Sequence, residues 1–113
     1  MSEELLRRAY AAFNARDVDG ALAVMHPDVD WPNGMEGGRE NGHAEVRAYW
    51  ERQFSMVDSR ADPEAFEELP DGRMSVTVHQ RARNLDGEVI WDARVRHVYE
   101  LRDGLVVRMD IAT

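Results

Sequence analysis

Apolar positions recur at helical spacing near the start of the chain. They return every three to four residues at Leu5, Leu6, Ala9, Tyr10, Ala12 and Phe13. Ser2 is a suitable helix cap, and Glu3 and Glu4 are favourable in a first turn. The pattern breaks at residues 14–16. We therefore expect a first helix that ends at this break.

Two further helices are expected before residue 59. Asp17 can cap a short helix whose apolar residues are Leu22, Val24 and Met25. The pair His26-Pro27 should end it, because a residue before proline disfavours the α conformation. A short strand at residues 29–33 and a glycine-rich loop follow. The third helix should start near Asn41 or Gly42, with one apolar side made of Val46, Tyr49, Trp50, Phe54 and Val57.

Beyond Ser59 the apolar positions alternate, which is typical of strands. Strands are expected at residues 64–69, 73–83, 88–101 and 105–112. Hairpin turns between them are predicted at Asp71-Gly72, Asp86-Gly87 and Asp103-Gly104. Tight turns join antiparallel neighbours, and a long strand must twist. Residues 1–113 are therefore predicted to form one α+β domain, with three N-terminal helices packed on a curved antiparallel sheet.

Alternation along the strands also predicts which side chains face the helices. On strand 88–101 the inward set is Val89, Trp91, Ala93, Val95, His97, Tyr99 and Leu101. Gln80 faces inward on the preceding strand, and the last strand contributes Leu105, Val107, Met109 and Ile111. The outer face carries arginines together with Ile90, Val98 and Val106. A partly apolar outer face predicts a contact surface for a second copy of the chain.

Composition excludes several classes of function. The net charge of -8 argues against nucleic-acid binding, which needs a basic surface. The chain has no cysteine and no lysine, which excludes disulfides, thiol nucleophiles and lysine Schiff bases. His26, His43 and His79 lack the spacing of metal ligands, so no metal or other cofactor is expected. No signal peptide or membrane-spanning run is recognisable, and we expect a soluble cytoplasmic protein without membrane or nucleic-acid partners.

Two motifs in this order of elements carry a resemblance to a known family. They are NARDVDG at residues 14–20 and HVYELRDG at residues 97–104. The chain resembles, over nearly its whole length, the SnoaL-like, ketosteroid-isomerase-like family of the nuclear transport factor 2 superfamily. The resemblance implies a cone-shaped roll, in which a curved sheet wraps three helices and leaves a pocket at the open end. It also implies a homodimer formed through the outer face of the sheet.

The functional positions of the family can be aligned with this sequence one by one. The steroid isomerases have a general-base aspartate at the end of the first strand, and the aligned residue here is Asn33. An asparagine cannot accept a proton from carbon. Their oxyanion tyrosine aligns with Ala9, one residue before Tyr10, and their oxyanion aspartic acid aligns with His97. Steroid isomerisation by the family mechanism is therefore not expected.

His97 is the predicted catalytic residue, because an imidazole on an apolar face can donate, accept and titrate near neutral pH. The alternative is a structural histidine bonded to backbone or to Gln80. Asn33 is predicted to face the pocket, the alternative being that it closes the turn before Gly34. The predicted ligand-binding residues are Trp31, Asn33, Tyr49, Trp50, Gln80, Trp91, Tyr99 and Met109. For the aromatic residues the alternative is plain core filling.

Three functions remain open from the sequence. The first is a cofactor-free enzyme of the isomerase, dehydratase or cyclase type, which acts by proton transfer on a small apolar organic molecule. Its acid or base would be His97, and Glu36 or Glu40 could join it if the glycine-rich loop closes. The second is a protein that binds the small apolar ligand without chemistry. The third is a dimeric interaction module whose core is filled.

Overall fold

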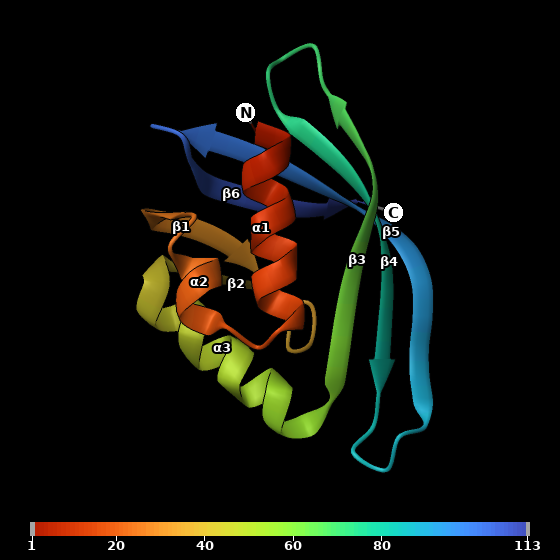
Figure 1. Ribbon diagram of the computed structural model, residues 1–113. Helices are drawn as coiled ribbons and strands as arrows, with labels where there is room; N and C mark the ends of the chain where they lie inside the picture. Colours follow the sequence, from red (N-terminus) through yellow and green to blue (C-terminus); the bar gives the residue numbers. More distant parts are fainter. Residues whose placement is uncertain (1, 113) are drawn as a thin grey trace.

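The computed structural model describes residues 2–112, in which three helices pack against one curved sheet (Figure 1). The helices are α1 (Ser2–Asn14), α2 (Val18–Leu22) and α3 (Gly42–Met56). The strands are β1 (Met25–Pro32), β2 (Arg39–Asn41), β3 (Asp58–Glu68), β4 (Met74–Arg83), β5 (Val89–Arg102) and β6 (Leu105–Ala112). The predicted α+β class is confirmed. The predicted cap at the Ser2 side chain lies outside the described part of the chain.

The strands lie in the order β2-β1-β6-β5-β4-β3 in a six-stranded sheet. Strands β3 to β6 form the predicted antiparallel meander. Strand β1 joins this meander by parallel pairing with β6, a pairing that the sequence pattern did not predict. Tight turns impose antiparallel pairing only on neighbours in sequence, and most of the chain separates β1 from β6.

Helix α2 is shorter than predicted. Asp17 caps it as expected, since its side chain accepts a hydrogen bond of 2.9 Å from the backbone N–H of Gly20. The assignment of Val24 and Met25 to this helix is wrong, because the helix ends at Leu22 and β1 begins at Met25. The carbonyl of Val24 accepts the N–H of Val106 at 3.0 Å. Pairing with β6 outweighs the helical pattern at these two residues.

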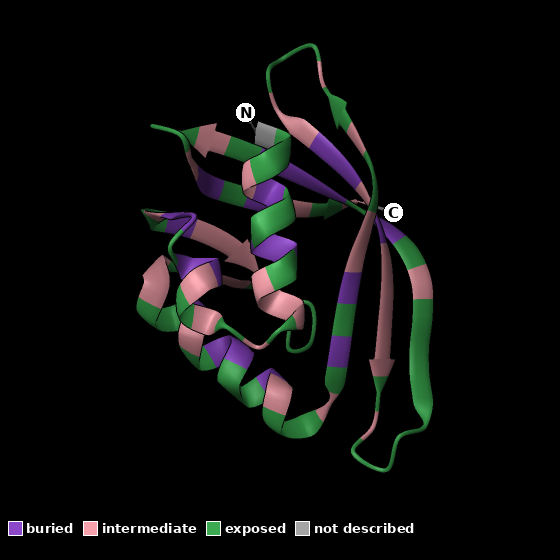
Figure 2. Ribbon diagram, in the orientation of Figure 1, coloured by how far each residue is buried: buried purple, intermediate pink, exposed green. Residues whose placement is uncertain are grey.

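The concave side of the sheet packs against α1 and α3 and forms the core. Figure 2 shows buried residues where the helices meet the sheet, whereas the start of β5 is exposed. Leu6 and Tyr10 of α1 and Val46 and Trp50 of α3 are buried there, together with the sheet residues Val76, Val78, Val95, Tyr99 and Met109. This arrangement leaves the inward faces of β3, β4 and β5 beside the ends of α1 and α3, where the candidate site lies.

An irregularity in the pairing of β5 with β6 changes one predicted face. The register shifts between Glu100 and Leu101, so that Val106 lies opposite Leu101 and is fully buried. Val106 was predicted to face outward, and a shift of one residue reverses the side on which a strand residue lies. Val98 alternates with the inward-facing His97 and Tyr99 and is not part of the core cluster, whereas Ile90 lines the cavity described below. The predicted outward direction is therefore wrong for Val106 and Ile90, and Val98 faces outward as predicted.

Candidate functional site

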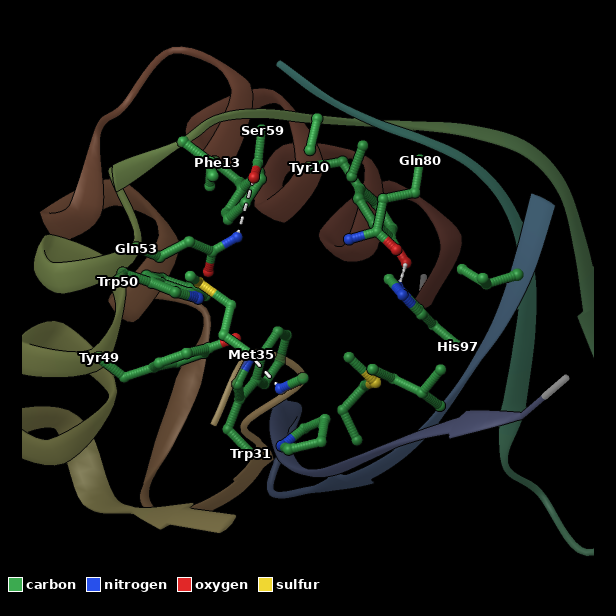
Figure 3. Close-up of a pocket in the computed structure, with 18 of the residues that line it drawn as sticks. Tyr10, Phe13, Trp31, Met35, Tyr49, Trp50, Gln53, Ser59, Gln80 and His97 are labelled. Carbon is green, nitrogen blue, oxygen red and sulfur yellow. Dashed lines mark hydrogen bonds between the residues drawn. The ribbon is translucent and has the colours of Figure 1, made fainter. Parts of the chain in front are cut away.

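A cavity of about 590 Å³ opens between the concave side of the sheet and the helices α1 and α3. Its wall combines side chains from both helices and from five strands (Figure 3). The described lining residues include no Asp, Glu or Arg. Their titratable groups are the hydroxyls of Tyr10, Tyr49 and Tyr99 and the imidazole of His97. The cavity is therefore apolar, with few polar groups at defined places, as is typical of sites for small organic ligands.

Three of these groups form a hydrogen-bonded chain. The hydroxyl of Tyr99 donates to the hydroxyl of Tyr10 at 2.7 Å, and Tyr10 lies 2.7 Å from Nδ1 of His97. His97 and Tyr99 are two residues apart on β5, so both face inward, and Tyr10 reaches them from α1. The Tyr10 and His97 rings are nearly parallel, with an interplanar angle of 13°. Contacts from helix α1 and from strand β5 thus hold the imidazole of His97 in one orientation.

Burial keeps this chain uncharged at neutral pH. It lowers the pKa of His97 from 6.5 to about 4 and raises the pKa of Tyr10 and of Tyr99. Because Tyr10 accepts the proton of Tyr99, its own proton is available for Nδ1 of His97. The ring proton of a neutral imidazole then resides on Nε2. This arrangement of donors and acceptors favours the Nε2–H tautomer of His97.

Nε2 of His97 is open to the cavity. The ring has one side-chain partner among the described residues, Tyr10, and that bond uses Nδ1. Among those residues, the one buried side-chain nitrogen or oxygen without a partner is Nε of Arg81. Nε2 of His97 also has no hydrogen-bond partner among the described residues, but it is not one of these inaccessible atoms. Since His97 lines the cavity, a molecule in the cavity can reach Nε2. The site thus presents an N–H donor in an apolar space.

Aromatic rings form much of the remaining wall. Trp31 of β1 and Trp50 of α3 meet edge to face, with ring centroids 5.5 Å apart, and Phe13 of α1 packs against Trp50 at the same separation. Tyr49 completes this side, and Trp91, which is half exposed, lies at the rim. The structure therefore brings these predicted residues together around the cavity: Trp31, Tyr49, Trp50, Gln80, Trp91, His97, Tyr99 and Met109.

Asn33 is the predicted site residue that the structure places elsewhere. Its Oδ1 accepts the N–H groups of Met35 and Glu36, and its Nδ2 donates to Glu36 and Glu40, each at 3.0 Å. The side chain is buried but is not part of the cavity wall. Its prediction as a ligand-binding residue is corrected, because all its hydrogen bonds serve to close the loop between β1 and β2. Its neighbours Gly34 and Met35 line the cavity instead.

The two loop carboxylates also lie away from the cavity wall. Glu36 pairs with Arg52 of α3 at 2.9 Å, which lowers the pKa of Glu36. Glu40 accepts the hydrogen bond from Asn33. In this arrangement neither Glu36 nor Glu40 can act as a base on a molecule in the cavity.

Sequence reasoning missed one polar pair in the cavity wall. Gln53 and Ser59 are buried and joined by a hydrogen bond of 3.0 Å from Nε2 of Gln53 to Oγ of Ser59. Ser59 faces inward because β3 begins at Asp58 and not, as predicted, at residue 64. Gln53 follows Tyr49 and Trp50 by four and three positions on α3, a spacing that could have identified it on the same helix face.

Comparison with known proteins agrees with this architecture. Residues 6–109 match the sequence model of the SnoaL-like domain. The chain belongs to the SnoaL-like family. The resemblance drawn from the two sequence motifs is confirmed, and so is the cone-shaped α+β fold that it implied. No match was found among curated proteins.

Several solved structures share the SnoaL-like fold of this chain. TerC, co-crystallised with polyporic acid, is 32% identical with a TM-score of 0.84, over 97% of this chain and 88% of that chain. An NTF2-like protein of unknown function from Burkholderia pseudomallei is 30% identical, with the same TM-score of 0.84 and coverage of 97% and 88%. A Mycobacterium tuberculosis protein in complex with estradiol-17beta-hemisuccinate is 17% identical, with a TM-score of 0.82 over 96% and 89%.

Two further findings concern possible metal and membrane contacts of this SnoaL-like chain. Within residues 2–112, no group of three or more His, Asp or Glu side chains is placed to hold a metal ion. None of the helices described is long and apolar enough to cross a membrane.

Proposed function

We propose that this SnoaL-like protein is a cofactor-free enzyme of the isomerase, dehydratase or cyclase type, which acts by proton transfer on a small apolar organic molecule. The observation that carries the proposal is the Tyr99–Tyr10–His97 chain, which ends in a neutral imidazole whose Nε2–H is open to an apolar cavity. His97 is the proposed catalytic residue.

The chemistry follows from the neutral state of His97. A neutral imidazole that donates from Nε2 can polarise a substrate carbonyl oxygen and stabilise negative charge that develops there. The hydrogen bond is strong because the surroundings are apolar and the donor is already oriented. Activation of a carbonyl group is the first step common to isomerisation, dehydration and ring closure at that group. The tyrosines orient the imidazole and keep its proton on Nε2.

The described part of the cavity wall holds no carboxylate side chain, which limits the reactions that the site can catalyse. Because Nε2 of His97 already carries the ring proton, a proton lost from carbon must then pass to water or to another atom of the substrate itself. Reactions in which the substrate carries its own acidic C–H or its own nucleophile suit such a site best. This favours tautomerisation or cyclisation of a dicarbonyl-like compound over abstraction of a weakly acidic proton.

A small organic ligand is also supported by comparison. TerC, which is 32% identical over nearly the whole chain, was co-crystallised with polyporic acid. Trp31, Tyr49 and Trp50 are the proposed ligand-binding walls here, and Gln80 is the proposed hydrogen-bond partner of the ligand beside His97. Trp91, Tyr99 and Met109 complete the proposed binding surface.

A binding protein without catalytic activity is the second candidate. The observation that favours it is the same absence of a carboxylate from the described cavity wall. Such a protein would use the cavity and its polar groups in the same way, but His97 would orient the ligand only. An interaction module of the same fold requires a filled core, and the cavity of about 590 Å³ counts against it.

The test is exchange of protons next to a carbonyl group, followed by NMR in deuterated water on a panel of small cyclic diketones and unsaturated ketones. We expect catalysed exchange or isomerisation by the wild type and a loss of about a hundredfold in His97→Ala. His79→Ala is the matched control, because His79 pairs with Asp92 and is not part of the cavity wall. Ligand binding without any turnover would favour the binding protein, and full activity of His97→Ala would exclude the proposed role.

Three predictions from the sequence are carried forward as part of the proposal. We propose that residues 1–113 act as one SnoaL-like domain, that the protein is cytoplasmic, and that two copies associate through the outer face of the sheet. That face carries paired charges such as Arg94 with Glu64, which suit a polar interface. Sedimentation equilibrium would decide between monomer and dimer.

A further inference from the structure

The Gln53–Ser59 pair takes no part in the reaction proposed above, yet it lies in the same cavity wall. Gln53 belongs to the last turns of α3 and is 7% exposed, and Ser59 is the second residue of β3 and is 3% exposed. The hydrogen bond between them spans the junction of the two elements. It fixes the amide of Gln53 at one place on the wall.

Both residues retain hydrogen-bonding capacity that the described protein does not use. The bond from Nε2 of Gln53 to Oγ of Ser59 occupies one donor and one acceptor. Oε1 of Gln53 has no partner among the described residues, and neither does the hydroxyl hydrogen of Ser59. Oε1 is accessible, because in residues 2–112 the sole side-chain nitrogen or oxygen that is both inaccessible and without a partner is Nε of Arg81. A buried amide oxygen is costly unless it is bonded, so the contents of the cavity must satisfy it.

The pair lies across the cavity from the imidazole. Figure 3 shows Gln53 and Ser59 on one side and Gln80 with His97 on the other, with Trp31, Tyr49 and Trp50 along the wall between them. The cavity thus has two separate polar places joined by an aromatic wall. A ligand that satisfies both must extend between them and present a flat face to the indole and phenol rings.

The charge of the wall narrows the class of ligand further. No Asp, Glu or Arg belongs to the described lining, His97 is neutral at pH 7 because its pKa is about 4, and the pKa of Tyr10 and Tyr99 is raised. An ion buried without a counter-charge would lose its hydration without compensation. The site therefore disfavours carboxylates and ammonium groups inside the cavity.

We infer that the ligand of this site is an uncharged, flat, conjugated molecule with a carbonyl or hydroxyl group at each end, and that the Gln53–Ser59 pair recognises the end remote from His97. This inference rests on the proposed function only in placing the first polar group at His97. Gln53 offers an acceptor and Ser59 a donor, so a phenolic hydroxyl can bond to both at once. These two residues are therefore specificity-determining.

Stilbenes provide matched probes, because they are rigid, flat and uncharged. Isothermal titration would compare stilbene with no hydroxyl group, with one para hydroxyl group and with one at each end, and would add stilbene carboxylate. In the wild type we expect the dihydroxy compound to bind about five- to tenfold more tightly than the monohydroxy compound, which corresponds to one added buried hydrogen bond. We expect the carboxylate to bind at least tenfold more weakly than the monohydroxy compound.

The variants separate recognition at the second end from general binding. In Gln53→Met and in Ser59→Ala the ratio between dihydroxy and monohydroxy stilbene should fall to about one. Ser55→Ala is the matched control, because Ser55 is exposed on α3 and bonds to the backbone of Arg52. Circular dichroism checks that each variant is folded, and Ser59→Ala tests the inference even where Gln53→Met does not fold.

Each outcome supports or overturns the inference. A wild type that does not distinguish the two hydroxylated compounds, or variants that keep the ratio, would overturn the role of the pair. Absence of binding by every stilbene at about millimolar concentration, or preference for the carboxylate, would overturn the ligand class. Failure of the proposed function looks different: turnover would be absent or independent of His97 while the stilbene ratios still depended on Gln53 and Ser59.

Discussion

Nδ1 of His97 lies 2.7 Å from the hydroxyl oxygen of Tyr10, although 87 positions separate the two residues in the sequence. The contact joins α1 to β5 across the core and leaves Nε2 of the imidazole for the cavity. Tyr10 also accepts a hydrogen bond from Tyr99, so one tyrosine holds the orientation of His97 and favours the tautomer with the proton on Nε2.

Replacing Tyr10 by Phe removes the partner of Nδ1 and leaves a polar atom unpaired in the interior. We expect a loss of about 1–3 kcal/mol in the free energy of unfolding, measured by urea denaturation. Nitrogen-15 NMR of the histidine rings should show that the Nε2–H tautomer of His97 is no longer dominant. Tyr99→Phe is the comparison, because it removes one hydrogen bond and leaves Nδ1 paired. Equal tautomer populations before and after Tyr10→Phe would contradict the assignment.

The buried His97 should make stability depend on pH. Its pKa is 6.5 when exposed and about 4 in the folded protein, so the unfolded state binds the proton more readily. The contribution of the neutral His97 to the free energy of unfolding is therefore fully present above about pH 6.5 and decreases as the pH falls towards 4. The total effect is on the order of 3 kcal/mol. The difference between the stability curves of wild type and His97→Gln isolates this contribution, and parallel curves over that range would refute it.

Asn33 should contribute to stability through the loop that it closes. Its four hydrogen bonds hold residues 33–40, and the alanine variant leaves two backbone N–H groups without an acceptor. We expect Asn33→Ala to cost about 1–3 kcal/mol in thermal or urea unfolding. Asn41→Ala is the control, because Asn41 is exposed and its side chain makes no capping bond; its effect should stay within about 0.5 kcal/mol. A similar loss of unfolding free energy in both variants would contradict the proposed role of Asn33 in closing the loop.

Trp50 and Trp91 should differ in how much their removal lowers the free energy of unfolding. Trp50 is 2% exposed and packs against Phe13 and Trp31, so Trp50→Ala should cost about 3–5 kcal/mol. Trp91 is 52% exposed at the rim of the cavity, and Trp91→Ala should cost less than about 1 kcal/mol while weakening ligand binding. Chemical denaturation of both variants measures the difference. A Trp91 variant as unstable as the Trp50 variant would disagree with the burial that the structure shows.

Strand alternation correctly predicted the inward direction of several side chains that line the cavity. Gln80, His97, Tyr99 and Met109 all face inward as expected, because the side-chain period of a strand is two and the register there is regular. Whether these residues bind a ligand stays a prediction. The same rule was wrong for Val106, because an irregularity of the β5–β6 pairing follows from the packing of both strands and not from the local pattern.

Two other outcomes show why the site could not be derived completely. Asn33 was predicted to face the pocket, yet its side chain is bound by loop groups that become neighbours only when β2 pairs with β1. Gln53 and Ser59 were missed because a glutamine near a helix end and a serine near a strand start usually face solvent. Their burial depends on how α3 and β3 meet.

The sequence by itself determined the order of the helices and of every strand except the short β2, the hairpins at the Asp-Gly pairs and the family of the fold. These features depend on hydrophobic periodicity and turn chemistry, which act over a few neighbouring residues. Tertiary structure alone decided the parallel pairing of β1 with β6, the contact of Tyr10 with His97 and the place of the Gln53–Ser59 pair. Those features require residues distant in sequence to meet, and their energies depend on burial, which exists only once the chain is folded.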